Sequence, residues 1–119
     1  MRSIALTVTT NASGAGSVTV NIGYHALLFA VEWGLGTFDA GVDAVLKNDD
    51  TLNGTDETIL TLTDANTSRK YYPRILEQDL AGADLTTRTL PLMGGDVTLT
   101  IASGGNVKTG TLWLYLLEA

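Results

Sequence analysis

The chain has 119 residues, 45% of them hydrophobic and 17% charged, and its thirteen acids against seven bases give a net charge of −6. This length suits one domain with a single core, and the composition is too apolar for a disordered chain. The absence of cysteine and the single histidine exclude disulfide scaffolds, thiol nucleophiles, cysteine-based zinc sites and multi-histidine metal sites.

Two alternating stretches open the chain. Aliphatic side chains occupy every second position over residues 3–9 and again over 17–22, and a turn rich in Gly, Ser and Asn at 11–16 separates them. Alternation with a period of two is the pattern of a half-buried strand, so we expect an N-terminal hairpin. The first stretch begins directly after Met1 without an apolar leader, so we expect no signal peptide.

An unbroken apolar run follows at residues 26–33. Such a run fits either a central strand covered on both faces or a buried helix. Because Gly23, Gly34 and Gly36 bracket it, we favour the central strand. It is far too short to span a membrane. The alternation at 42–47 predicts the next strand.

The middle of the chain continues with polar turns between short strands. Pro73 cannot donate a ladder hydrogen bond, so the strand that contains it should lie at an edge or a bulge. We expect a polar loop at 48–56, strands at 58–63 and 69–75, a long loop at 77–87 and a short extended segment at 88–93.

A final pair of strands closes the chain. Residues 97–101 alternate, and the Gly-rich sequence at 102–106 predicts a hairpin turn into a last strand at 107–117. One side of that strand is aliphatic and should face the core. The other side presents threonines with Trp113 and Tyr115, and it should form the outer face of the sheet.

These patterns amount to seven to nine short strands and no convincing helix. We therefore predict an all-β fold, a single domain over residues 1–119 built as an antiparallel, jelly-roll-like β-sandwich of about eight strands.

The net charge is concentrated in one stretch. Residues 39–64 contain seven acids and one lysine, which accounts for the whole −6, so we expect a local acidic surface able to meet a basic partner. The acidic loop at 49–57 could also attract a hard cation, but Leu52 stands where an EF-hand needs its second oxygen ligand. We expect a polar loop, with no metal and no cofactor.

The candidates for chemistry are few. His25 has no serine nucleophile in a recognisable setting, and Glu32 is a single acid where glycoside hydrolysis needs a pair. The Gly-Gly pairs at 94–95 and 104–105 lack the residues of a phosphate loop. Residues 69–74 mix bases with tyrosines, as single-strand binders do, but the acidic net charge disfavours nucleic acid. We expect no enzymatic activity.

Three stretches, in order along the chain, carry a resemblance: RSIALT at 2–7, LTLTDANTS at 60–68 with YPR at 72–74, and IASGGNVKTGT at 101–111. The sequence resembles the small virion proteins that tailed bacteriophages encode beside the major capsid protein. The resemblance implies a capsid decoration, or cement, protein, made in the host cytoplasm and located on the capsid surface. It also implies binding across capsomer junctions, the major capsid protein as partner, and a homo-oligomer, with a trimer favoured over a dimer.

A protein of this kind works through contact, and aromatic side chains near the centre of an interface often dominate binding. The alternative for the two tryptophans, and the one we favour, is a place in the core. The candidate interface residues are Trp33, Tyr71, Tyr72, Trp113 and Tyr115, with the acidic Asp49, Asp50, Asp56 and Glu57 steering the approach. Two alternatives stay open: another virion part, such as a neck, tail or fibre-base protein, and a carbohydrate-binding module with exposed aromatic residues.

Overall fold

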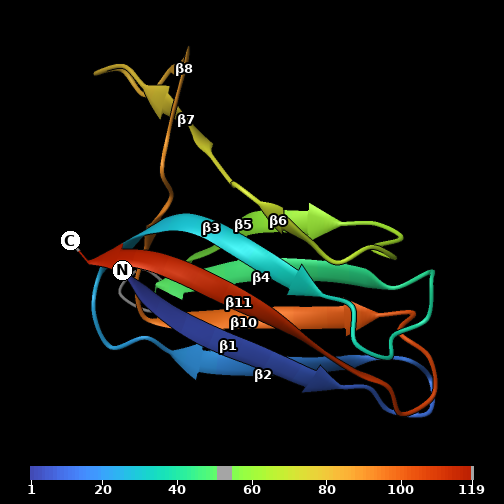
Figure 1. Ribbon diagram of the computed structural model, residues 1–119. Helices are drawn as coiled ribbons and strands as arrows, with labels where there is room; N and C mark the ends of the chain where they lie inside the picture. The colour runs from blue at the N-terminus through green and yellow to red at the C-terminus, as the bar shows by residue number, and fades with distance from the viewer. Residues whose placement is uncertain (51–54, 119) are drawn as a thin grey trace.

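The computed structural model describes residues 1–50 and 55–118 as a β-sandwich with a projecting arm (Figure 1). The strands are β1 (Arg2–Thr9), β2 (Gly16–Asn21), β3 (Ala26–Gly34), β4 (Asp43–Asp50), β5 (Thr55–Leu62), β6 (Arg69–Tyr71), β7 (Ile75–Gln78), β8 (Asp84–Thr89), β9 (Leu92–Met93), β10 (Asp96–Ala102) and β11 (Thr109–Glu118). No helix among the described residues is long and apolar enough to cross a bilayer.

Nine of these strands form two facing sheets. Sheet A has the order β1-β11-β3-β6, with β9 also beside β3, and sheet B has the order β2-β10-β4-β5. Every pairing is antiparallel. The chain changes sheet at most of its connections, and this interleaved order is that of a jelly roll. The predicted fold class is therefore confirmed.

The core lies between the two sheets, where the aliphatic side of each strand points inward. The alternation of β10 and β11 is regular enough that every second residue is buried. Burying an aliphatic side chain of this size contributes roughly 1.5–3 kcal/mol, so the inward stripe is the main source of stability. Its largest fully buried aliphatic members include Leu6, Leu28, Leu46, Leu99, Leu112, Leu114 and Leu116.

Both predicted terminal hairpins are wrong. Strands β1 and β2 belong to different sheets, and so do β10 and β11, so each turn carries the chain across the sandwich. Alternation reports which side of a strand is buried, but it does not tell one sheet from its facing partner. The two crossing turns pack against each other, and the Gly104 N–H donates to the Gly14 carbonyl oxygen at 2.9 Å.

Three other boundaries differ from expectation. The expected loop at 48–56 is wrong at both ends, because β4 continues to Asp50 and β5 starts at Thr55. The expected strand at 69–75 breaks at Pro73, where the chain leaves the edge of sheet A. The expected loop at 77–87 is instead part of a β-hairpin, β7 with β8, which projects from the body as an arm (Figure 1).

Candidate interaction surfaces

The outer face of sheet A carries aromatic side chains on β11. The register places Trp113 between Ala5 of β1 and Glu32 of β3, and Tyr115 between Ser3 and Ala30. Both aromatic side chains are half-buried. The outer face is where the alternation of β11 had pointed for this side of the strand. For Trp113, which the sequence left open between core and interface, the structure gives a half-buried position on that face.

A hydrogen bond joins outward-facing side chains of β11 and β3. The Tyr115 hydroxyl donates to Glu32 Oε2 at 3.2 Å. Desolvation raises the pKa of Tyr115 above its ordinary 10.0, and the hydrogen bond and negative charge of Glu32 raise it further. The hydroxyl therefore stays protonated near neutral pH and holds its ring in place.

A bulge in β3 adds an exposed aromatic side chain to this face. Tyr115 pairs with Ala30 while the next residue of β11 pairs with Leu28, so Phe29 is the extra residue between them. The bulge turns Phe29 outward, where 38% of its surface is exposed. The expectation that this strand is covered on both faces is thus wrong at Phe29.

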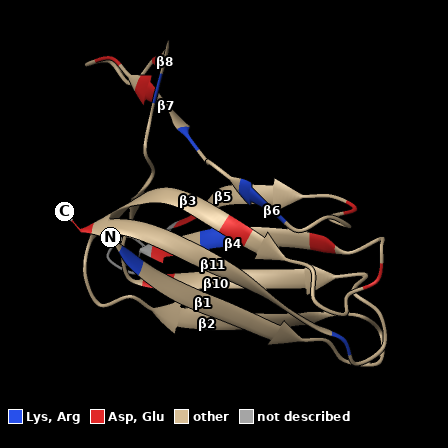
Figure 2. Cartoon of the chain, in the orientation of Figure 1, with Lys and Arg blue, Asp and Glu red and all other residues tan. Residues whose placement is uncertain are grey.

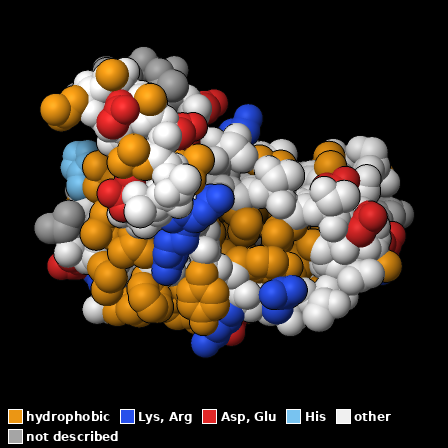
Figure 3. Space-filling model, turned by 90° about the horizontal axis from the view of Figure 1, so that it is seen from above, with side chains coloured by type: hydrophobic (Ala, Val, Ile, Leu, Met, Phe, Trp, Pro, Cys, Tyr) orange, Lys and Arg blue, Asp and Glu red, His pale blue; other side chains and the backbone are white. Residues whose placement is uncertain are grey.

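Phe29 forms one wall of a hollow of about 210 Å³, which we call the aromatic hollow. Its lining residues are Met1, Phe29, Ala30, Lys70, Tyr72 and Tyr115. Phe29 and Tyr72 meet edge to face, with ring centroids 6.2 Å apart and planes at 90°. Figure 3, viewed from the side of the arm, shows hydrophobic side chains gathered over this end of the molecule with basic side chains between them.

Arg74 anchors the chain where it leaves sheet A beside the hollow. Its guanidinium lies 5.8 Å from the Phe29 ring centroid. The Arg74 Nη1–H groups donate to the carbonyl oxygens of Phe29 at 3.0 Å and of Pro73 at 2.7 Å. These contacts fix the base of the arm next to Phe29 and place a positive charge at the edge of the hollow.

The arm itself consists of β7 and β8, which pair only with each other among the described strands. Every residue of β8 is exposed. At the tip, Leu80 is fully exposed and Leu85 is 42% exposed. A two-stranded hairpin without further packing is at best marginally stable in water, so an arm of this kind is suited to contact with another surface.

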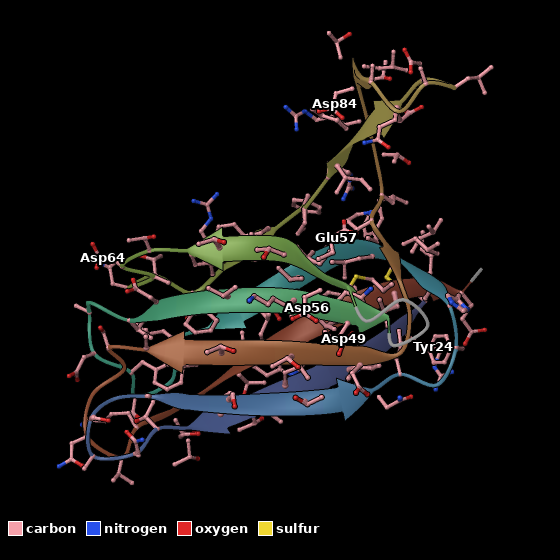
Figure 4. The ribbon with its side chains drawn as sticks, turned by 180° about the vertical axis from the view of Figure 1, so that it is seen from behind. Tyr24, Asp49, Asp56, Glu57, Asp64 and Asp84 are labelled. Carbon is pink, nitrogen blue, oxygen red and sulfur yellow. The ribbon has the colours of Figure 1, made fainter. Side chains whose placement is uncertain are left out.

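The acidic stretch at 39–64 does not form one surface. The Asp43 carboxylate accepts a hydrogen bond from the Asp64 N–H at one end of sheet B, whereas Asp49, Asp56 and Glu57 lie toward the other end (Figure 4). Figure 2 likewise shows acidic residues dispersed over the sandwich. The predicted single acidic surface is therefore wrong, because the β4–β5 hairpin separates residues that are close in sequence.

A shorter acidic row crosses three strands of sheet B. Asp49 of β4 lies opposite Asp56 of β5 on one side and Asp96 of β10 on the other. The Asn21 side-chain amide donates to Asp96 Oδ1 at 3.0 Å, whereas the buried Asp49 Oδ1 has no hydrogen-bond partner among the described residues. Sequence reasoning missed Asp96, which is distant from the acidic stretch along the chain.

The remaining acidic candidates do not complete a metal site. Glu57 pairs with Asn48 and thus points to the opposite side of the sheet from Asp49. Within residues 1–50 and 55–118, no group of three or more His, Cys, Asp or Glu side chains is arranged to hold a metal ion. Of the segment 49–57, where a cation was considered, residues 51–54 and the side chains of Asp50 and Thr55 lie outside the described residues.

Two aromatic candidates belong elsewhere. Trp33 is completely buried, stacks on Phe38 with ring centroids 5.8 Å apart, and donates from Nε1 to the Ala65 carbonyl oxygen at 2.8 Å. It is a core residue, so of the two places that the sequence left open for Trp33 the structure shows the core. Tyr71 packs partly against the core, with Arg69 4.9 Å from its ring centroid, and so lies apart from the aromatic hollow.

Sequence reasoning also missed residues that the surfaces depend on. Phe29 was treated as part of a fully covered strand, and Leu80 as part of a loop. Comparison with known proteins adds no assignment: no protein-family model matches the chain, and no curated protein sequence matches it.

Proposed function

We propose that this chain is a structural virion protein: a capsid decoration protein of a tailed bacteriophage that binds the outer surface of the head across capsomer junctions and stabilises the shell. Its expected partners are the major capsid protein and further copies of itself. The proposal joins the family resemblance of the sequence to the surfaces described above.

The arm carries the proposal. A hairpin that exposes Leu80 completely and Leu85 substantially gains its stability from a neighbour. A rigid sandwich with such an arm can contact two subunits at once, as binding across a junction requires. Fold alone does not establish this role, since jelly rolls serve many functions.

The aromatic hollow supports protein contact better than sugar binding. A carbohydrate-binding module should present aromatic rings in one plane for stacking. Phe29 and Tyr72 instead meet at 90°, so this pair offers a recess with apolar walls. Such a recess suits an inserted side chain, which is how anchor residues act at protein interfaces.

The test is to mix the purified protein with expanded, undecorated heads of the phage that encodes it. We expect saturating binding at a fixed number of copies per capsomer, together with a higher temperature of head disruption. The same protein should not bind purified tails. Sedimentation of the heads with quantification of the bound chain measures the ratio.

Two results would contradict the proposal in different ways. If the heads take up no protein at saturating concentrations, decoration is ruled out. If the protein binds tails or necks in place of heads, the other virion role is correct. As a control for surface specificity, Val107→Asp changes a 64% exposed residue in the β10–β11 loop, remote from the arm, and should bind normally.

A further inference from the structure

We propose that the arm of one copy inserts Leu80 into the aromatic hollow of a second copy, so that the chain assembles through arm-to-hollow contacts. This inference deepens the self-association part of the proposed function and rests on it, but it does not depend on the capsid as a partner. It assigns both halves of an interface to described residues.

The tip of the arm is built to present Leu80. The Asp79 carboxylate accepts hydrogen bonds from the backbone N–H groups of Ala81 and Ala83, both at 2.9 Å. The Asp79 N–H donates to the Ala83 carbonyl oxygen at 2.9 Å, and the Gly82 N–H donates to the Asp79 carbonyl oxygen at 3.0 Å. This closed turn orders the backbone and leaves the leucine side chain fully in solvent, so covering it with another surface would be favourable.

The hollow has the size and lining for such a side chain. Its volume is about 210 Å³. The aromatic rings that line it are those of Phe29 in β3, Tyr72 directly after β6, and Tyr115 in β11. For comparison, a cavity of about 150 Å³ lined by apolar groups accommodates benzene. The hollow therefore has room for an isobutyl group beside the Phe29 and Tyr72 rings, which contact each other.

The charges of the two surfaces are complementary. Residues 75–89 of the arm contain three acids, Glu77, Asp79 and Asp84, and one base, Arg88. The hollow includes Lys70 in its lining and has Arg74 at its edge. Opposite charge at the rim favours approach of an acidic tip and fixes its orientation.

The occupant is a second copy because the arm cannot serve its own hollow in this fold. The arm projects away from the body (Figure 1), and Leu80 is fully exposed. Since every copy carries one arm and one hollow, two copies can exchange arms reciprocally or successive copies can join head to tail. A head-to-tail contact closes into a ring when the rotation between copies permits it.

A disulfide trap tests the contact directly, because the chain contains no cysteine that could interfere. The variant Leu80→Cys is mixed with the variant Tyr72→Cys in a redox buffer and analysed on a non-reducing gel. We expect a covalent dimer containing one chain of each variant. The matched pair Leu80→Cys with Val107→Cys should give no such dimer.

Sedimentation at a series of protein concentrations supplies the second measurement. Leu80→Asp should raise the dissociation constant of self-association at least about tenfold, as loss of an apolar anchor does. Because Leu80 is fully exposed, the variant should keep the circular dichroism spectrum of the wild type. Val107→Asp should associate like the wild type.

The proposal is overturned if the wild type stays monomeric at every concentration reached, or if Leu80→Asp associates as strongly as the wild type. These results are separable from the decoration test, since no heads are present. If the arm-to-hollow dimer is trapped but the protein fails to bind heads, this inference stands and the decoration proposal is wrong. If the protein stays monomeric but binds heads, the decoration proposal stands and this inference is wrong.

Discussion

Trp113 lies directly over Gly34 on the outer face of sheet A. A Cβ atom at position 34 would come within 2.7 Å of Trp113 Cζ3 and 3.1 Å of Cη2. Only glycine leaves room for the indole ring to lie against β3. The half-burial of Trp113 on an outer sheet face therefore depends on a missing side chain in the neighbouring strand.

The variant Gly34→Ala should consequently lift Trp113 off the sheet. We expect a loss of about 1–3 kcal/mol in the free energy of unfolding, as for overpacked sites, and a red shift of tryptophan emission. Urea denaturation and fluorescence measure both. Gly41→Ala is the matched control, because the nearest atom to a Cβ there is 3.9 Å away. Equal losses in the two variants would show that the ring does not depend on Gly34.

The two tryptophans should respond differently to truncation. Trp33→Ala empties a core site and leaves the Ala65 carbonyl oxygen without its donor, so it should cost about 3–5 kcal/mol or prevent folding. Trp113→Ala removes a half-buried ring and should cost about half as much or less. Chemical denaturation of both variants gives the comparison. If Trp113→Ala were the more damaging substitution, the assignment of core and outer face would be reversed.

The strands and their buried sides could be predicted because period-two burial is a local property of the sequence. The outer position of Trp113, for example, follows from its alternation with the buried Leu112 and Leu114. The choice of sheet could not be predicted in this way. Both sheets bury the same kind of side chain, so β1 and β2 resemble a hairpin although they face each other across the core.

The candidate surfaces depend on features that a sequence pattern does not display. Phe29 turns outward because of a register shift between β3 and β11, which is fixed by pairing between distant segments. The arm has the composition of a loop, and its turn is closed by Asp79, a residue equally common in unstructured segments. Asp96 joins Asp49 only through the pairing of β10 with β4.

Neutralising Asp49 should stabilise the protein. Asp49 faces Asp56 and Asp96 on the two neighbouring strands, and like charges directly opposite each other destabilise a sheet. Asp49→Asn should raise the free energy of unfolding by about 0.2–1 kcal/mol in low salt. The gain should shrink in high salt, which screens the repulsion in the wild type.

The matched control for this effect is Glu57→Gln, because Glu57 lies opposite Asn48 and has no carboxylate across from it. Its stability should change little at either salt concentration. Urea denaturation in low and high salt measures both variants. If Asp49→Asn proved less stable than the wild type in low salt, the expected repulsion of Asp49 by Asp56 and Asp96 would be contradicted.

The Tyr115–Glu32 hydrogen bond should make stability depend on alkaline pH. Burial and Glu32 raise the pKa of Tyr115 in the folded protein above its ordinary value of 10.0. A group whose pKa is raised by folding contributes stability that is present below the unfolded pKa and lost as the pH rises through the folded pKa. The wild type should therefore lose stability above about pH 10 more steeply than Tyr115→Phe, which has no proton to release. Tyrosinate absorbance should show that Tyr115→Phe lacks one late-ionising group that the wild type has. Parallel stability profiles for the two proteins would rule out this coupling.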